Sequence, residues 1–338
     1  MHSVQPVTVS APSRLHFGLL AVGRQSGLQY GGIGLMVRQP RTVVSVSSAQ
    51  QLDIDPASPT TVRETVERWL TWQRANLKSA LGRDIVAIEQ LPVSVRVLQV
   101  PPRHQGLGTG TQLAFATALA LTRSFQLQVD SAETFSAALN RGRRSTIGTF
   151  GFFLGGLLVD RGRLPSDRLS PLDFRTDFPE EWPIVLIQDR QMFSTGLSGA
   201  KELAAFDQLS PTAESYRSAL VDLIQNSILS GVLQRNFNLF AEGLYQFGKQ
   251  SGLQFQSVQS GAYHSRQVAE LVEFVRACGV LAVGQSSWGP GVFAILPSDE
   301  WAAFLINRID DRYPGRYQFT ISQADNQGAV FGPAPSLS

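Results

Sequence analysis

Alternating apolar and polar residues at the start of the chain predict β-strands. Runs of strand type occupy residues 7–11, 13–20, 29–37 and 42–47, separated by short links. Successive side chains of a strand face opposite sides, so Arg14, His16 and Gly18 share one face while Leu15 and Phe17 share the other. The first fifty residues are therefore expected to form an antiparallel meander.

The spacing of apolar residues changes to the helical period after residue 59. Val62, Val66, Trp69 and Leu70 recur at helical intervals in a helix expected over residues 59–80. Further helices are expected over residues 111–125, from an N-cap at Asp130 or Ser131 to Asn140, over 211–249 in two or three pieces, and over 268–277 and 298–308. Strands are expected over residues 91–100, 182–187, 279–284, 291–296 and 317–322, and residues 150–160 predict either a buried strand pair or a passage from helix to strand.

The whole pattern predicts an α+β fold of two domains. Residues 161–180 are rich in proline, aspartate, arginine and serine and lack periodicity, which makes them the expected boundary. The predicted domains are residues 1–165 and 180–330. A chain of 338 residues is long enough to form two ordinary domains with substantial cores.

A glycine-rich loop stands between the strand expected at 91–100 and the helix expected at 111–125. Its residues are Gly106, Leu107, Gly108, Thr109, Gly110 and Thr111. Backbone N–H groups at the positive, N-terminal end of a helix are well placed to bind phosphate. The alternative is a tight turn with a glycine-rich helix cap, and the loop by itself favours neither interpretation.

Composition narrows the classes of function. Basic and acidic residues are nearly balanced, 29 against 27, so the charge does not indicate a nucleic-acid-binding surface. The single cysteine, Cys278, excludes a disulfide framework within the chain. The N-terminus lacks the basic and apolar regions of a signal peptide, and no apolar run reaches membrane-spanning length. We therefore expect a cytoplasmic protein with neither a membrane nor a nucleic acid as partner.

Four further patches could carry chemistry. They are Arg14 with His16, Tyr30-Gly31-Gly32, the basic loop at 141–145, and residues 284–291. Each also has a structural interpretation: a solvated strand face, close backbone approach within a strand, a basic helix end, and a hairpin loop. The sequence contains no HxxxH or HExxH metal spacing, no GxSxG elbow and no GxxxxGK[ST] loop.

The order of these patches resembles the GHMP kinase superfamily. Ala11-Pro12-Ser13-Arg14-Leu15-His16-Phe17-Gly18 is similar to its first motif, residues 102–110 to its phosphate loop, and residues 284–291 to its third glycine motif. The resemblance implies a two-domain fold, with a ribosomal-S5-domain-2-like N-terminal domain and a ferredoxin-like α/β C-terminal domain. Relatives in the superfamily are frequently dimers, so the resemblance also allows a homodimer.

Five segments further resemble the β-ribofuranosylaminobenzene 5′-phosphate synthase family, at residues 14–19, 30–34, 106–113, 142–148 and 284–290. This resemblance implies phosphoribosyl transfer from phosphoribosyl pyrophosphate to 4-aminobenzoate or 4-hydroxybenzoate. Carbon dioxide and pyrophosphate leave, and the reaction opens tetrahydromethanopterin biosynthesis. The partners are then small molecules, and Mg²⁺ is the implied cofactor because pyrophosphate departs.

A kinase and an inactive relative remain the alternatives. GHMP kinases typically carry an aspartate in a Ser-Gly-x-Asp context, where this chain has Ser145-Thr146-Ile147-Gly148. Gly148 therefore stands at the expected acid position, which disfavours ATP-dependent kinase chemistry by that route. A relative that kept the fold and binds a ligand without catalysis is the third class.

The resemblance also assigns expected roles to individual residues. The expected catalytic residues are Arg14, His16, Arg144 and Ser145, since arginine forks hold carboxylates and phosphates. The expected substrate- and phosphate-binding residues are Gly31, Gly32, Gly106, Leu107, Gly108, Thr109, Gly110, Thr111, Gln285, Ser286, Ser287 and Trp288. No carboxylate cluster marks metal ligands, so Asp160 and Asp189 are named only as candidates at strand ends.

Overall fold

The computed structural model describes residues 4–23, 27–76, 87–128, 131–191, 209–259 and 261–333. Its strands are β1 (Val7–Ala21), β2 (Tyr30–Ser48), β3 (Asp53–Ile54), β4 (Val93–Gln99), β5 (Leu157–Asp160), β6 (Leu172–Thr176), β7 (Ile184–Asp189), β8 (Ala282–Gln285), β9 (Val292–Ile295), β10 (Tyr317–Ser322) and β11 (Val330–Gly332). Its helices are α1 (Thr60–Asn76), the 3₁₀ turn η1 (Ile88–Gln90), α3 (Thr109–Ser124), α4 (Ala132–Leu139), α5 (Ile147–Leu154), α7 (Glu214–Leu223), the π-helical η2 (Ile224–Leu229), α8 (Ser230–Leu233), α9 (Phe237–Leu253), α10 (Arg266–Ala277) and α11 (Asp299–Arg312).

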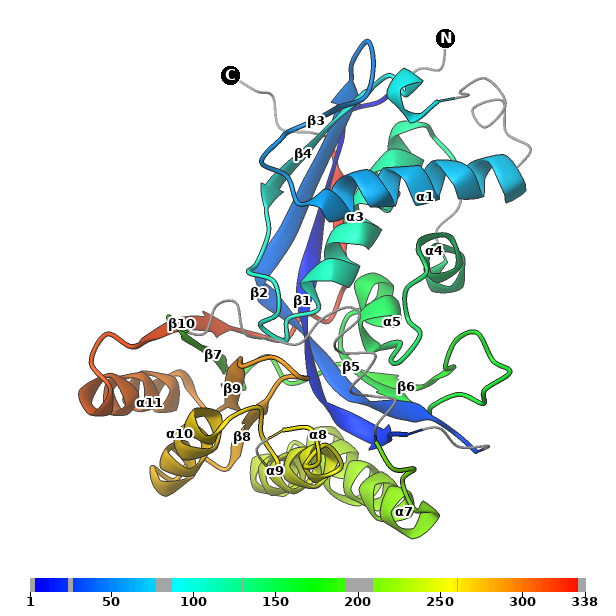
Figure 1. Cartoon of the computed structure of the whole chain (residues 1–338). Helices are drawn as coiled ribbons and strands as arrows, with labels where there is room; N and C mark the ends of the chain where they lie inside the picture. Colours follow the sequence, from blue (N-terminus) through cyan, green and yellow to red (C-terminus); the bar gives the residue numbers. More distant parts are fainter. Residues whose placement is uncertain are drawn as a thin grey trace.

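Two sheets organise these elements. The larger sheet has the order β11-β1-β2-β4-β3. In addition, β5 pairs with the N-terminal part of β2, and β6 pairs with β5 at the edge of the sheet. The smaller sheet has the order β10-β7-β9-β8 and is antiparallel throughout. The long hairpin partners β1 and β2 run from the end that carries β3 and β4 to the end beside α9 (Figure 1).

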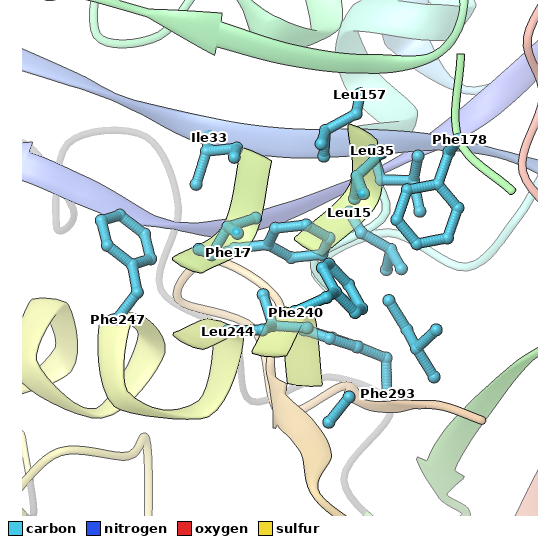
Figure 2. Packing of buried hydrophobic residues seen from close by; sticks show 14 of the residues in the cluster. Leu15, Phe17, Ile33, Leu35, Leu157, Phe178, Phe240, Leu244, Phe247 and Phe293 are labelled. Carbon is cyan, nitrogen blue, oxygen red and sulfur yellow. The ribbon is translucent and has the colours of Figure 1, made fainter. Parts of the chain in front are cut away.

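The three largest hydrophobic clusters of the described residues hold the layers together. In the first, Trp69 of α1 and Phe115 of α3 are buried against the β1–β2–β4 part of the larger sheet. The third lies between the smaller sheet and helices α10 and α11. The second joins the two sheets: Phe17 of β1 packs with Phe293 of β9 at a ring distance of 5.1 Å, in one cluster with Phe240 of α9 (Figure 2). The β1–β2 ribbon and the C-terminal elements are therefore fixed to one another by a shared apolar core.

Most of the predicted elements are confirmed. The four runs predicted in the first fifty residues are antiparallel strands as expected, but they join into two long strands, β1 and β2, that form one hairpin and not a meander. Ser131 is the N-cap of α4 and accepts a hydrogen bond from the Thr134 N–H, and β8 pairs with β9. Residues 150–160 form the passage from helix to strand, not the strand pair. Asp130, the other N-cap candidate, and residues 77–80 of the first helix lie outside the described residues.

The expected boundary contains a strand that its sequence did not predict. β6 lies at the edge of the larger sheet, and all five of its side chains are exposed or half-buried, so no apolar alternation marks it. At the other end of the chain, β11 returns to pair with β1. The larger sheet thus includes elements from both sides of the predicted boundary, while the limits 1–165 and 180–330 stay a prediction. Within the described residues, no helix is long and apolar enough to cross a membrane.

Candidate active site

A cavity of about 540 Å³ opens where the C-terminal half of β1 meets the loop after α4, the end of α9 and the β8–β9 connection. Eight of the predicted site residues line it: Arg14, His16, Thr111, Arg144, Ser145, Gln285, Ser287 and Trp288. They come from four segments that are distant in the sequence. The fold therefore gathers half of the predicted residues around one space, while their chemical roles stay predictions.

Irregularities in β1 place Arg14 and His16 at this cavity. The pairing with β2 shifts register between Ala11 and Ser13 and again between His16 and Gly18. Such bulges bend a strand and redirect its side chains. The Arg14 N–H donates to the Leu107 carbonyl at 2.9 Å, and the His16 carbonyl accepts from the Ser287 N–H at 2.9 Å. These bonds fix β1 to the glycine loop on one side and to the β8–β9 connection on the other.

The glycine loop packs beneath the cavity wall. Gly106 has φ +77°, and a Cβ there would collide with the Ser286 carbonyl oxygen. The Ser286 hydroxyl donates to the Gly106 carbonyl at 2.7 Å and accepts from the His16 N–H at 3.0 Å. At Gly108, φ is +69° and a Cβ would stand 3.1 Å from the Arg14 Cβ. These close approaches explain both glycines structurally.

Most of the predicted residues in and around this loop lie outside the cavity lining. Gly106, Leu107, Gly108, Thr109, Gly110 and Ser286 do not line the cavity, although Thr111 in the next turn does. Phosphate binding by them stays a prediction.

Gly31 and Gly32 lie in β2 and are not among the residues that line the cavity, although Tyr30 before them is. A Cβ at Gly31, where φ is +73°, would stand 2.7 Å from the Gly162 nitrogen, and one at Gly32 would collide with the Gly18 carbonyl oxygen. Close backbone packing is therefore sufficient to explain these two glycines. Substrate binding by Gly31 and Gly32 stays a prediction without support from their position.

Asp160 shapes the loop that carries Arg144 and Ser145. One carboxylate oxygen accepts from the Thr146 N–H at 2.7 Å and the Thr146 hydroxyl at 2.9 Å. The other accepts from the Gly162 N–H at 2.9 Å and the Ser170 hydroxyl. Burial raises the pKa of Asp160, against the opposing effect of these hydrogen bonds. Both oxygens are engaged and the side chain does not line the cavity, so Asp160 does not suit a substrate-bound metal.

Asp189, the other metal candidate, lies outside the cavity as well. Its carboxylate accepts from Arg316 Nε at 2.9 Å and Arg316 Nη2 at 2.8 Å, and from the Gln191 N–H at 2.8 Å. Among the described residues, no group of three or more His, Cys, Asp or Glu side chains could hold a metal ion. The donor set therefore does not fit a protein-held Mg²⁺.

His16 is a neutral hydrogen-bonding group. Its Nε2 lies 2.9 Å from the Ser145 hydroxyl, and its side chain is buried. Burial, reinforced by the positive charge of Arg14, lowers the pKa of His16 well below its usual range. The imidazole is therefore uncharged at neutral pH and can exchange a hydrogen bond with Ser145 or with a bound ligand.

Two kinds of side chain dominate the lining of the cavity. The cationic ones are Arg14, Arg141, Arg143, Arg144 and Arg163. The aromatic ones are Phe17, Tyr30, Phe255, Tyr263 and Trp288, of which Phe255 and Trp288 meet edge to face at 4.8 Å. No aspartate or glutamate is found among the described residues that line it. The lining therefore offers cationic groups to phosphate or carboxylate oxygens and aromatic surface to a flat ring.

The lining also contains residues that are not among the predicted site residues. Arg141 and Arg143 belong to the basic loop at 141–145, whose composition is a signal in the sequence, although only Arg144 and Ser145 of that loop are predicted as site residues. Arg163, Phe255 and Tyr263 carried no local signal, because each reaches the cavity through contacts with segments distant in the sequence.

Comparison with known proteins finds relatives along the whole chain. Residues 228–315 match the family model described as "GHMP kinases C terminal". The "Beta-ribofuranosylphenol 5'-phosphate synthase" of Methanothermobacter thermautotrophicus is 26% identical over 337 residues, which cover 95% of this chain and 97% of that protein. The protein of the same name from Methanocaldococcus jannaschii is 24% identical, with coverage of 95% and 98%.

Solved structures show the same fold. Homoserine kinase from Cytophaga hutchinsonii superposes with a TM-score of 0.66 at 15% identity, covering 97% of this chain and 98% of that one. Mevalonate pyrophosphate decarboxylase from Streptococcus pyogenes gives a TM-score of 0.64 at 15% identity, with coverage of 97% and 99%. The chain therefore has the α+β fold of the GHMP kinases, and its resemblance to the β-ribofuranosylphenol 5′-phosphate synthases extends over nearly its whole length.

Proposed function

We propose that this protein is a pentosyltransferase that moves the phosphoribosyl group of phosphoribosyl pyrophosphate to a para-substituted benzoate. The acceptor is 4-hydroxybenzoate or 4-aminobenzoate, and the relatives' name, which specifies a phenol, favours the hydroxy acid. The observation that carries the proposal is a single cavity lined by five arginines and five aromatic side chains, whose described lining has no carboxylate. The donor brings two phosphate-bearing ends, and the acceptor brings a flat ring with a carboxylate.

The bond changes require binding and charge stabilisation more than proton removal. The ring carbon that bears the carboxylate forms a bond to the anomeric carbon, while the anomeric C–O bond breaks and pyrophosphate leaves with its electron pair. The C–CO₂ bond then breaks, and its electron pair restores the aromatic ring. No proton is lost from the attacked carbon. The absence of a carboxylate base among the described lining residues is therefore compatible with this chemistry.

The cavity residues supply these needs in different ways. Arg14 and Arg144 offer guanidinium groups to the benzoate carboxylate and to phosphate oxygens, where charge-assisted hydrogen bonds are strong. His16, neutral and hydrogen-bonded to Ser145, positions the acceptor without adding charge. Trp288 provides an apolar surface for the aromatic ring. The Gln285 side chain accepts a hydrogen bond from the His264 N–H at 2.6 Å and donates one to the Ser287 carbonyl at 2.8 Å. These two bonds fix the loop before Trp288.

We further propose that Mg²⁺ enters as part of the donor substrate, bound to its diphosphate oxygens. The described part of the chain offers no carboxylate in the cavity and no metal-binding group elsewhere. Oxygen ligands are what Mg²⁺ prefers, and diphosphate supplies them. The arginines then need to balance only the charge that the metal leaves uncompensated.

A GHMP kinase is the second candidate, and the geometry at Gly148 argues against it. A Cβ at Gly148 would stand 3.7 Å from Arg14 Nε and 3.4 Å from Gln112 Nε2. A carboxylate at this position would therefore lie beside the Arg14 guanidinium at the cavity, where an acid could act on a bound hydroxyl. Glycine supplies no such group, and Asp160 is engaged by its own hydrogen bonds.

Parallel assays separate the candidates. The protein is incubated with Mg²⁺, phosphoribosyl pyrophosphate and either benzoate while pyrophosphate and carbon dioxide are measured, and with ATP and GHMP alcohol substrates while ADP is measured. The proposal predicts pyrophosphate and carbon dioxide in equal amounts in the first assay and no alcohol-dependent ADP in the second. ATP turnover without pyrophosphate release in the first assay would show a kinase. Ligand binding with no turnover in either assay would show a binding protein.

A further inference from the structure

Arg141 is a cavity residue whose guanidinium makes no ion pair with a carboxylate of the described chain. It follows α4 after Asn140, whose φ of +55° turns the backbone. The Arg141 N–H donates to the Ser136 carbonyl at 3.1 Å, and the Arg141 carbonyl accepts from the Ser136 hydroxyl. The backbone is thus held on both sides of the peptide, so the position of this arginine is determined by the fold.

The surroundings of the guanidinium are predominantly cationic. Burial lowers the pKa of Arg141, and the charges of Arg68 and Arg103 lower it further, while Glu64 opposes them. The Nε atom is buried and has no hydrogen-bond partner in the described part of the chain. A desolvated cation close to like charges is unfavourable unless an anion joins it.

Two neighbouring arginines of the cavity differ from Arg141, because their guanidinium groups make hydrogen bonds within the described chain. Arg143 Nε donates to the Asn140 side-chain oxygen at 2.8 Å. Arg163 Nε donates to the Arg143 carbonyl at 2.8 Å, and its Nη1 donates to the Asp167 carbonyl at 2.8 Å. These two guanidinium groups shape the loop, whereas Arg141 leaves donors for a ligand.

The first turn of α3 lies beside Arg141. The Arg141 Nη1 atom is 4.0 Å from the point where a Cβ would stand on Gly110, and Thr111 lines the same cavity. α3 begins at Thr109 after Gly108, an N-cap residue without a side chain to accept from the first N–H groups. The positive end of the helix therefore adds to the positive charge of the guanidinium at this part of the cavity.

We propose that Arg141, beside the first turn of α3, forms a subsite for the diphosphate of the donor, the group that leaves. The assignment of the anion as the leaving diphosphate rests on the proposed function. Arg14 and Arg144 then remain for the benzoate carboxylate and the sugar phosphate. The fork of the guanidinium can hold two diphosphate oxygens at once, which a point charge at the same place cannot.

Binding of inorganic pyrophosphate tests the subsite without requiring turnover. Isothermal titration calorimetry compares pyrophosphate with ribose 5-phosphate on the wild type, Arg141→Met, Arg141→Lys and Arg68→Met. Arg68 is the matched control, because it carries the same charge close to Arg141 but donates to the Leu139 carbonyl and does not line the cavity. We expect the Kd for pyrophosphate to rise at least about tenfold in Arg141→Met, less in Arg141→Lys, and no more than about threefold in Arg68→Met.

The outcomes separate this inference from the proposed reaction. An unchanged pyrophosphate Kd in Arg141→Met, an equal loss in Arg68→Met, or a larger loss of ribose 5-phosphate than of pyrophosphate would each overturn the subsite. Wild-type protein that does not bind pyrophosphate would overturn it too. Arg141→Lys keeps the charge and the stem, so it retains the test if Arg141→Met is poorly folded. A wild type that binds pyrophosphate through Arg141 yet turns over no benzoate would refute the reaction and leave the subsite standing.

Discussion

Replacing Asp160 with asparagine perturbs the support of the loop that carries Arg144 and Ser145, and it changes none of the side chains that line the cavity. The carboxylate accepts four hydrogen bonds, two on each oxygen: from the Thr146 N–H and hydroxyl, and from the Gly162 N–H and Ser170 hydroxyl. Asparagine keeps only one acceptor oxygen. Whichever way its amide turns, the NH₂ group faces two donors, one of which is a backbone N–H that cannot rotate away.

The magnitude follows from these contacts. A buried donor left without a partner costs about 1–3 kcal/mol, and a hydrogen bond to a charged acceptor contributes about 1.5–3 kcal/mol. Two hydroxyl groups can turn to other acceptors, and the Thr146 hydroxyl already lies 3.1 Å from the Ser170 carbonyl. We therefore expect Asp160→Asn to lower the free energy of unfolding by about 2–4 kcal/mol.

The assay pairs stability with kinetics. Urea unfolding measures the free energy, and kcat/KM is measured well below the melting temperature. Thr146 follows Ser145, so displacement of its N–H moves the Ser145 hydroxyl away from His16, and kcat/KM should fall at least about tenfold.

Asp189→Asn is the control for this experiment, since it also alters a buried carboxylate but lies outside the cavity. It should lower stability and leave kcat/KM within about twofold of the wild type. The reasoning is refuted if Asp160→Asn unfolds with the wild-type free energy, or if Asp189→Asn loses as much activity as Asp160→Asn.

Three further predictions concern the same region. His16 is neutral in the folded protein and gains a proton below pH 6.5 in the unfolded chain, so its contribution to stability is present above that pH and is lost as the pH falls. Between pH 7 and pH 5.5, the free energy of unfolding in urea should fall by about 1.4 kcal/mol more in the wild type than in His16→Gln. Equal losses in the two proteins would contradict a buried neutral His16. Gly106→Ala should lower the melting temperature far more than Gly261→Ala. The backbone strain is similar at the two sites, where φ is +77° and +78°, but only the new Cβ at position 106 would collide with backbone atoms, those of Ser286. Similar changes in melting temperature would mean that the contact with Ser286 is unimportant. Trp288→Ala should raise the KM for the benzoate at least about tenfold. Trp301→Ala, which changes an exposed residue outside this cavity, should leave that KM unchanged. An unchanged KM in Trp288→Ala would show that Trp288 does not contact the acceptor ring.

The sequence predicts the parts of this fold whose signals are local. Val62, Val66 and Trp69 repeat at the helical period because α1 buries one face, and the Ser131 cap marks the start of α4 by its own side chain. β6 escapes prediction because an edge strand buries little and needs no apolar alternation.

The site is predictable to the extent that its motifs are contiguous. Arg14, His16, Arg144 and Ser145 lie in such motifs, and the fold brings them together. The glycine loop also appears as a motif, but its packing partner Ser286 is 180 residues away, so the structural reason for Gly106 is invisible in the sequence. Two features are defined only by the tertiary structure. They are the support that Asp160 gives to the loop, and the burial of Arg141 Nε without a hydrogen-bond partner among the described residues.

The central claim is that one cavity couples departure of pyrophosphate to loss of the acceptor's carboxyl group. Its most direct test is incubation of the protein with phosphoribosyl pyrophosphate, Mg²⁺ and 4-hydroxybenzoate labelled in the carboxyl carbon. The account predicts that labelled carbon dioxide and pyrophosphate appear in a one-to-one ratio and that both depend on the two substrates together. Pyrophosphate released while the label stays in the aromatic product, or no release of either under conditions where both substrates bind, would contradict it.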